Sequence, residues 1–280
     1  MKLVRFGAAG AEKPGLIDAA GQIRDLSTHV ADITGDTLSP ASLAKLKAID
    51  PNSLPEAPKG VRIGPCVNPV ATRNFIAVGL NYADHAAETG APIPPEPILF
   101  NKLTNCIVGP NDNVMMPKGS LKLDWEVEIA FVMGRRCRYV EEKDALTYIA
   151  GYAVCNDVSE RHFQAERGGQ WMKGKCFETS GPLGPWLVTT DEIKDVQALP
   201  MFLDVNGKRM QTGSTKTMIF PIAHLVHYIS QFMVLEAGDV ITTGTPAGIG
   251  AFRTPPVYLQ PGDRLRFEVS GVGSMEHLIG

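Results

Sequence analysis

Three acidic residues, Asp124, Glu126 and Glu128, occupy alternate positions of the apolar run Leu123–Val132. A period of two predicts a strand, with the three carboxylates on one face and aromatic or aliphatic side chains on the other. Crowded carboxylates repel one another and lose free energy on burial unless a cation or protons neutralise them, so a hard divalent metal would resolve the arrangement. A solvated outer face, with Lys122 as a partial counter-charge, explains the run equally well.

A further carboxylate, Asp157, follows the short apolar stretch 153–155. Taken alone, an aspartate at such a position is more often a helix N-cap than a ligand. Arg161 and Gln164 stand four and seven positions beyond it, so in a helical segment all three side chains would share one face. This grouping favours a polar site to which Asp157 contributes.

His85 and Glu88 are three residues apart in the segment 79–88. On one helical turn this spacing places an imidazole beside a carboxylate. The carboxylate fixes the histidine tautomer and raises its basicity, which suits a general base that activates water. The alternative is an incidental pair on a surface helix, which is the commoner case for an arbitrary sequence.

The residues that follow this pair, 90–97, are rich in proline. Such a segment cannot form a helix, and it is too long for a tight turn. We therefore expect Ala83–Pro97 to form a mobile lid, poorly ordered without ligand and ordered when an oxalate-like or pyruvate-like anion is bound.

Two other segments carry groups suited to anions. Lys173 and Lys175 flank Gly174, and one of the two ammonium groups is a candidate for holding a substrate carboxylate or enolate. Residues 242–250 read TTGTPAGIG, and their glycines and hydroxyls would let backbone N–H groups face an anion. The segment lacks the GxxxxGK[ST] pattern, which excludes a nucleotide phosphate loop of that kind.

Composition excludes several classes of protein. The 280 residues carry a formal net charge of −3, which gives no electrostatic case for binding nucleic acid or anionic membranes. No uncharged run reaches the roughly 18 residues that suggest a membrane span. The N-terminal MKLVRFGAAG lacks the apolar core of a signal peptide, so a cytoplasmic location is the default expectation. Five cysteines without Cys-x-x-Cys spacing fit a reducing compartment.

Two parts are predicted along the chain. Residues 1–68 form a small α/β N-terminal domain, in which a β-meander precedes a helix after Pro40 and a proline-rich linker. Residues 69–280 form a β-rich α+β domain, in which Asn206-Gly207 marks a hairpin. The strands expected there are Asn74–Gly79, Val127–Met133, Pro200–Val205, Asp239–Thr243 and Arg264–Val269, and the helices expected are Glu141–Ile149 and Ile222–Gln231.

From about Asn74 to Val272 the chain resembles the fumarylacetoacetate hydrolase family. The matching segments are GLNYADHAAE, LDWEVEIAFVMGR, GYAVCNDVS, the Arg161/Gln164 spacing, GKCFET, GPLGPW, VNGKRMQ and GDVITTGTPAGIG. The first 65 residues resemble the small leading domain of many bacterial members, a weaker match. The resemblance implies a mixed β-roll, a homodimer and a small-molecule 2-oxo acid as substrate.

The resemblance also implies roles for individual residues. The expected Mg²⁺ or Mn²⁺ ligands are Glu126, Glu128 and Asp157, the expected catalytic residues are His85, Glu88 and Lys175, and the expected substrate contacts are Arg161, Gln164, Lys175 and Thr245. Asp124 matches no metal ligand of the shorter members and is expected behind the ligands. The chain departs from the family pattern at Glu160, His162 and Cys176, which bears on the substrate rather than on the metal.

Among the reactions of the family, the resemblance favours hydrolysis, because both members of the His85/Glu88 pair are present. The expected reaction cleaves a C–C bond of a 2,4-dioxo acid, an acylpyruvate or a 2,4-dioxo-3-deoxy sugar acid, and releases pyruvate. The alternative enzyme is an isomerase, lyase or decarboxylase of a related 2-oxo acid. The alternative outside enzymology is a catalytically silent homologue that binds a metal or an anion.

Overall fold

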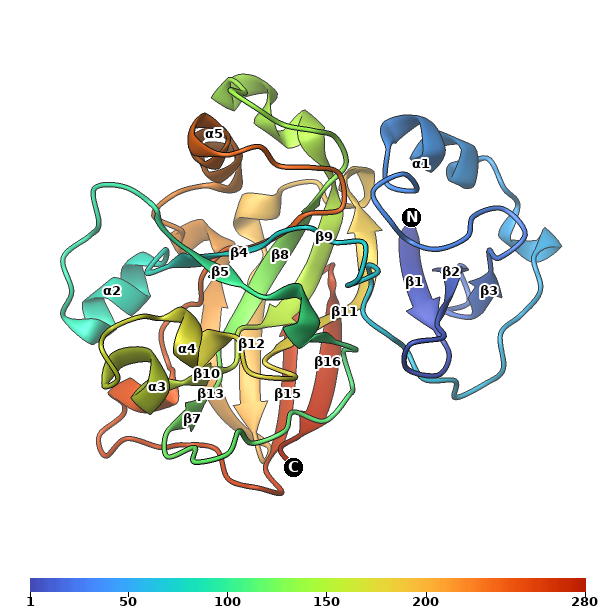
Figure 1. The fold of residues 1–280 in the computed structure, drawn as a ribbon. Helices are drawn as coiled ribbons and strands as arrows, with labels where there is room; N and C mark the ends of the chain where they lie inside the picture. The colour runs from blue at the N-terminus through green and yellow to red at the C-terminus, as the bar shows by residue number, and fades with distance from the viewer.

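The structure, a computed structural model, describes residues 1–280 and is built on one ten-stranded mixed sheet (Figure 1). Nine strands follow one another across the sheet, and β6 (Ile107–Val108) pairs with β11 off this path. Their order is β3 (Ile23–Asp25), β2 (Lys13–Ile17), β1 (Lys2–Phe6), β11 (Gly181–Thr189), β9 (Ile149–Asn156), β8 (Val127–Met133), β14 (Val240–Thr242), β4 (Phe75–Gly79) and β5 (Ile98–Lys102). The sheet has two open edges, so it closes no barrel.

Two smaller sheets complete the β structure. A four-stranded antiparallel sheet has the order β13 (Lys208–Ser214), β12 (Pro200–Val205), β15 (Arg264–Val269) and β16 (Gly273–Leu278). The short strands β7 (Leu123–Asp124) and β10 (Ser159–Glu160) pair with each other. The sheet-rich α+β fold predicted from the sequence is thereby confirmed.

The helices are few and short. They are α1 (Pro40–Lys47), α2 (Ala83–Thr89), α3 (Arg161–Ala165), α4 (Met172–Lys175) and α5 (Ile222–Phe232). Single 3₁₀ segments lie at Pro51–Ser53, Thr104–Cys106, Glu142–Tyr148, Thr190–Glu192, Val196–Ala198, Thr215–Thr217 and Gly250–Phe252. The helix predicted at Glu141–Ile149 is therefore a 3₁₀ helix. No helix is both long and apolar enough to cross a membrane.

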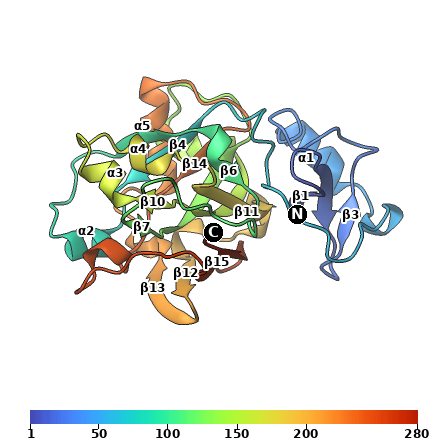
Figure 2. The ribbon, with the colours of Figure 1, turned by 60° about the horizontal axis from the view of Figure 1, so that its bottom comes forward.

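The predicted meander is present at the N-terminus, where β1, β2 and β3 pair antiparallel. Strand β1 also pairs with β11, so the meander extends the main sheet at one edge. Both views place this N-terminal part opposite α2, α3 and α4, which gather at the other side of the molecule (Figures 1 and 2).

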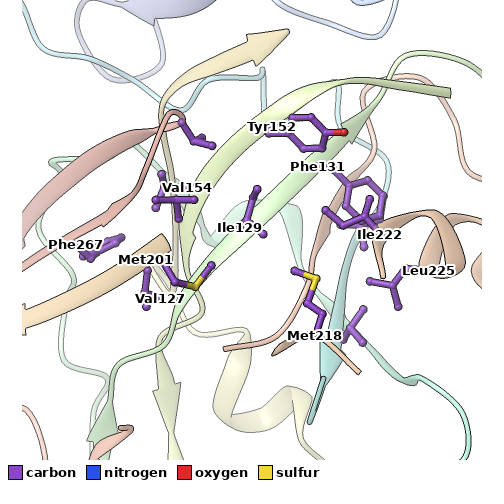
Figure 3. Close-up of a cluster of buried hydrophobic side chains, with 14 of the residues drawn as sticks. Val127, Ile129, Phe131, Tyr152, Val154, Met201, Met218, Ile222, Leu225 and Phe267 are labelled. Carbon is purple, nitrogen blue, oxygen red and sulfur yellow. The ribbon is translucent and has the colours of Figure 1, made fainter. Parts of the chain in front are cut away.

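The main hydrophobic core lies between the large sheet and the four-stranded sheet. Val127, Ile129 and Phe131 of β8 point into it, where they meet Met201 of β12 and Phe267 of β15 (Figure 3). Ala130 and Val132 of β8 belong to a second core that includes the N-terminal strands. Strand β8 is thus apolar on both faces except at Glu128.

Candidate active site

Three carboxylates meet at one end of the central strands. Glu126 precedes β8, Glu128 lies within it, and Asp157 follows β9. The strands pair antiparallel with Val127 opposite Asn156, which brings the end of β9 beside the start of β8. One oxygen from each carboxylate lies within 4.8 Å of the others. All three side chains are buried, with Glu126 6%, Glu128 1% and Asp157 1% exposed, so the solvated-face interpretation is wrong.

Two of these carboxylates have opposite electrostatic surroundings. Burial would raise the pKa of Glu126, but the charges of Lys175 and Arg161 outweigh burial and lower this pKa to about 2. Burial and the neighbouring charges of Asp157 and Glu126 raise the pKa of Glu128 well above its usual value. In the metal-free protein the surroundings therefore favour the charged form of Glu126 and the protonated form of Glu128.

The glycine-rich loop after β14 supports Glu128. Gly244 N donates a 2.8 Å hydrogen bond to Glu128 Oε2, and the Thr242 hydroxyl donates to the same oxygen. Gly244 has φ of +89°, a conformation that favours glycine. The anion that this loop's N–H group faces is thus the protein's own carboxylate. The Thr245 hydroxyl is also engaged, because it donates to Val127 O at 2.9 Å, although Thr245 lines the cavity.

Two buried lysines neutralise the cluster. Lys175 Nζ donates to Glu126 Oε2 at 2.7 Å and to Asp157 Oδ2 at 2.6 Å. Lys102, which the sequence analysis missed, lies with Nζ 2.7 Å from Asp157 Oδ1. Lys102 is buried, and the charge of Asp157 overcomes the effect of burial and raises its pKa. Of the two lysines singled out around Gly174, Lys175 belongs to the site, whereas exposed Lys173 donates to Arg167 O.

The oxygen atoms left open in this cluster fit a hard divalent metal. Asp157 Oδ1 is buried and accepts no hydrogen bond of good geometry; its neighbour Lys102 Nζ, 2.7 Å away, donates to Lys175 O and Ser180 O. Both hydrogen bonds to Glu128 reach Oε2, which leaves Oε1 open. A donor set of three carboxylates without nitrogen or sulfur suits Mg²⁺ or Mn²⁺ rather than zinc.

Arg161 connects the cluster to Asp124. Its Nε donates to Asp124 Oδ2 at 2.9 Å, its Nη2 to Glu126 Oε1 at 2.7 Å and its Nη1 to Gln164 Oε1 at 3.0 Å. Asp124 Oδ1 also accepts from Gly250 N, so Asp124 lies behind the three carboxylates. This position of Asp124 agrees with the expectation that Asp124 is not a metal ligand.

Two local expectations about this region are wrong. Asp157 does not share a helical face with Arg161 and Gln164, because β10 intervenes and α3 begins only at Arg161. Asp157 is also not the cap of α3, since that cap is Glu160, whose Oε2 accepts from Phe163 N at 2.7 Å. Glu160 Oε1 accepts from the backbone of Leu121 and Lys122 as well, so this buried residue attaches α3 to the preceding loop.

The His85/Glu88 pair lies on α2, and His85 lines a cavity that the three carboxylates also line. His85 Nδ1 is 3.0 Å from Glu88 Oε2, and Glu88 Oε1 accepts from Gly248 N at 2.9 Å. Glu88 is thereby fixed by the loop that also supports Glu128. His85 is only 8% exposed and contacts the Phe252 ring edge-on, so the pair is not a solvated surface feature.

The proposed lid has more anchors than the sequence indicated. Pro94 and Pro97 are buried, and Tyr228 of α5 donates a 2.7 Å hydrogen bond to Glu96 Oε2. The C-terminal end of the segment is therefore attached to α5, and its N-terminal end is helix α2. Its ordering by ligand stays a prediction.

A second feature that the sequence did not indicate lies behind the cluster. Asn156 accepts from Glu126 N through Oδ1 at 3.1 Å, and its amide nitrogen is 3.0 Å from His277 Nε2. Burial lowers the pKa of His277 to about 4, so its neutral ring accepts this hydrogen bond. No spacing in the sequence links His277 to Asn156. The half-buried Cys176 contacts Asn101 O and reaches no carboxylate of the cluster.

Comparison with known proteins places these features in a family. The profile described as fumarylacetoacetate (FAA) hydrolase C-terminal matches residues 74–279. A Burkholderia cenocepacia protein, whose name assigns it only provisionally to the hydrolases, is 57% identical over 274 residues, or 98% of this chain and 96% of that protein.

Two solved structures resemble the whole chain. Maleylpyruvate hydrolase from Sphingobium sp. SYK-6, in complex with manganese(II) and pyruvate, has a TM-score of 0.82 at 26% identity, covering 100% of this chain and 98% of that one. 2-Hydroxyhepta-2,4-diene-1,7-dioate isomerase from Mycobacterium marinum has a TM-score of 0.75 at 29% identity, with the same coverage.

The family profile spans the carboxylate cluster, both lysines and the His85/Glu88 pair, and the solved relatives extend the likeness through the N-terminal strands. The resemblance inferred from the sequence motifs is confirmed: this chain belongs to the fumarylacetoacetate hydrolase family.

Proposed function

We propose that this protein is a metal-dependent hydrolase that cleaves the C–C bond between carbons 3 and 4 of a 2,4-dioxo acid and releases pyruvate and a carboxylic acid. The observation that carries the proposal is the position of His85, which lines the same cavity as the carboxylate cluster and is paired with Glu88. The manganese and pyruvate reported for the Sphingobium maleylpyruvate hydrolase support a pyruvoyl substrate and a divalent metal.

Glu126, Glu128 and Asp157 would hold Mg²⁺ or Mn²⁺. When bound, the metal supplies Lewis-acid polarisation of the carboxylate and 2-oxo oxygens of a pyruvoyl unit. Lys175 is bound to two of the three carboxylates and keeps one N–H free for the substrate. Arg161 holds Glu126 from the other side, and the amide nitrogen of Gln164 is available for a substrate oxygen.

His85 acts as the general base. Its Nδ1–H donates to Glu88, which leaves the lone pair of Nε2 for a water molecule. His85 Nε2 takes a proton from this water, and the water oxygen forms a bond to carbon 4. The charge of Glu88 stabilises the imidazolium that results.

Cleavage then sends the electron pair of the bond between carbons 3 and 4 into the pyruvate enolate. The cationic groups of Lys175 and Arg161 stabilise the negative charge on its oxygens. The imidazolium of His85 returns its proton to carbon 3, which gives pyruvate and restores the base. One water is consumed, and one carboxylic acid and one pyruvate form.

Single-turnover release of pyruvate from an acylpyruvate tests the proposal. His85→Ala is expected to lose about 10²–10⁴-fold in rate, the usual cost of removing a general base. Oxalate binding in the presence of Mg²⁺ should be nearly unchanged, because His85 is not a ligand. Glu88→Gln should slow the reaction in the same direction. Parent-rate hydrolysis by His85→Ala would overturn the proposal.

The second candidate is isomerisation of an unsaturated 2-oxo dicarboxylate, which the likeness to the Mycobacterium marinum isomerase favours. Isomerisation moves protons within the substrate and consumes no water. Incubation in ¹⁸O-labelled water separates the two candidates, since only hydrolysis places one label in the carboxylic acid product. A catalytically silent homologue would bind oxalate and turn over neither substrate.

A further inference from the structure

The cavity has two chemically different parts. It encloses about 420 Å³, and its innermost lining is the buried carboxylate cluster with Lys175. Beyond that, the lining includes apolar side chains together with Lys122, Glu166 and Tyr258. We use the term apolar wall for six of the lining side chains, those of Leu80, Ile98, Phe100, Trp171, Ile249 and Phe252.

The apolar wall begins at the catalytic groups and reaches the surface. The Lys175 ammonium lies 5.4 Å from the centre of the Phe100 ring, and Trp171 meets that ring edge-on at 5.5 Å. Ile98 is two residues from Phe100 on β5, so its side chain projects from the same face, and it is 36% exposed. Phe252 lines the opposite side, beside His85.

Trp171 is held in place by a close approach to the main chain. A Cβ atom on Gly79 would lie 2.4 Å from Trp171 Cζ3, so the indole occupies space that only a glycine at position 79 leaves open. Trp171 and Phe100 also line a neighbouring hollow of about 390 Å³. The two rings therefore form a fixed partition on one side of the cavity.

Each cation of the cavity already pairs with a carboxylate of the protein. Lys122, near the mouth, forms an ion pair with exposed Glu166. Arg161 and Lys175 are each bound to two carboxylates of the site. A carboxylate at the far end of a substrate would lose its hydration against apolar side chains without a compensating charge.

We propose that the acyl group of the substrate is an uncharged alkyl or aryl group, and that Trp171 and Phe100 are the residues that select it. The proposal rests on the proposed function, because it assumes that the pyruvoyl end occupies the carboxylate cluster. It narrows the substrate to acylpyruvates with an apolar acyl group, and it disfavours dicarboxylates and the hydroxyl-rich sugar acids.

A matched pair of ligands tests the proposal by binding alone. 2-Oxohexanoate and 2-oxoadipate have the same chain length and differ only in a terminal methyl or carboxylate. Calorimetric titration of each into the full-length protein with saturating Mg²⁺ should show that 2-oxohexanoate binds at least about tenfold more tightly, since a pocket contact of this kind discriminates by that amount or more. Equal or tighter binding of 2-oxoadipate would overturn the proposal.

Two variants assign the selection to named residues. Trp171→Ala should weaken 2-oxohexanoate about tenfold and leave pyruvate unchanged, whereas Phe232→Ala, an exposed aromatic on α5 outside the cavity, should change neither. Glu166→Gln removes the partner of Lys122 and should strengthen 2-oxoadipate only. Glu166 is exposed, so this variant tests the charge argument even if Trp171→Ala fails to fold.

The titrations also separate this proposal from the proposed function. If pyruvate, oxalate and 2-oxohexanoate all fail to bind in a Mg²⁺-dependent manner, the pyruvoyl site itself is wrong. If pyruvate and oxalate bind but 2-oxoadipate equals 2-oxohexanoate, the function stands and the selection by the apolar wall is refuted.

Discussion

The protein has two clusters of charge, one half-buried and one buried, and they are built differently. The N-terminal cluster consists of Arg5, Glu12, Asp32, Arg62 and Asp112 and ties the first strands to the larger part of the chain. Arg5 pairs with both oxygens of Asp32, at 2.6 and 3.0 Å. Arg62 pairs with Asp112 Oδ1 at 2.7 Å and with Glu12 Oε1 at 2.8 Å. Every carboxylate oxygen in this cluster accepts a hydrogen bond.

The site cluster is incomplete by the same standard. Asp157 Oδ1 accepts no hydrogen bond of good geometry, although Lys102 Nζ lies 2.7 Å away, and the charges of Asp157 and Glu126 disfavour a charge on Glu128. Crowding three carboxylates into a buried site costs free energy, so this arrangement does not serve stability. The N-terminal cluster is thus fully hydrogen-bonded within the chain, whereas the site cluster keeps the open oxygens that the proposed function assigns to a metal.

The largest effect is expected in the complete cluster. Arg5→Met removes the guanidinium from Asp32 and Glu12, whose side chains are 17% and 6% exposed, and should lower the free energy of unfolding by about 3 kcal/mol. Urea denaturation followed by circular dichroism measures the change. The matched control is Arg264→Met, which breaks an exposed pair with Glu276 and should cost little. Equal costs for the two variants would show that the N-terminal cluster is not structural.

The next effect is expected from filling the incomplete cluster. Mg²⁺ at about 100 times its dissociation constant should stabilise the folded protein by about 2.7 kcal/mol, because it binds the folded state only. Asp157→Asn should lose this stabilisation. Asp124→Asn should retain it, since Asp124 faces Arg161 and Gly250 rather than the open oxygens.

Thermal unfolding with and without Mg²⁺ measures both variants against the parent. A lost response in Asp124→Asn together with a retained response in Asp157→Asn would mean that the three alternate acidic residues of the strand are the ligands, as their period alone suggested.

Where the signal is local, the sequence predicts the fold closely. Strands β8, β12 and β15 begin and end at the predicted residues. Burial alternates along β12 and β15, and the Asn206-Gly207 turn ends β12, whereas β8 is buried on both faces. Both turn residues have positive φ, 52° and 76°, as a tight hairpin requires. The expected metal ligands Glu126, Glu128 and Asp157 were identified through the family resemblance. The period of two alone groups Asp124 with Glu126 and Glu128 and does not include Asp157.

Contacts between distant segments were not predictable from one sequence. Lys102 lies in an unremarkable strand, and its partner Asp157 is far along the chain. His277 reaches the site only through Asn156. The role of Glu160 as a cap depends on a backbone turn that no spacing reports. Such residues acquire their roles from the pairing of strands, which brings them together only in the folded protein.

The smallest expected effect is a difference in metal-free stability between variants of Glu126 and variants of Glu128. The pKa of Glu126 is about 2 in the folded protein, below its unfolded value, so its stabilisation is present above pH 4.5 and is lost as pH falls toward 2. The pKa of Glu128 is raised, so its stabilising contribution is present below pH 4.5 and is lost as pH rises through the folded value.

Glu126→Gln and Glu128→Gln should therefore change metal-free stability in opposite directions at pH 7. Glu126→Gln deprives Lys175 and Arg161 of a charged partner and should destabilise. Glu128→Gln removes a carboxylate whose charge is disfavoured by burial and by two neighbouring charges, and it keeps an oxygen that accepts from Thr242 and Gly244. This variant should stabilise the folded protein by on the order of 1 kcal/mol, which raises the midpoint of thermal unfolding by about 2–4 °C. The gain should shrink as pH falls toward 4.5. Thermal unfolding from pH 4.5 to 8 in the presence of a chelator measures both variants. If Glu128→Gln is less stable than the parent at pH 7, the Glu128 carboxylate is stabilised by its partners in the same way as those of the N-terminal cluster.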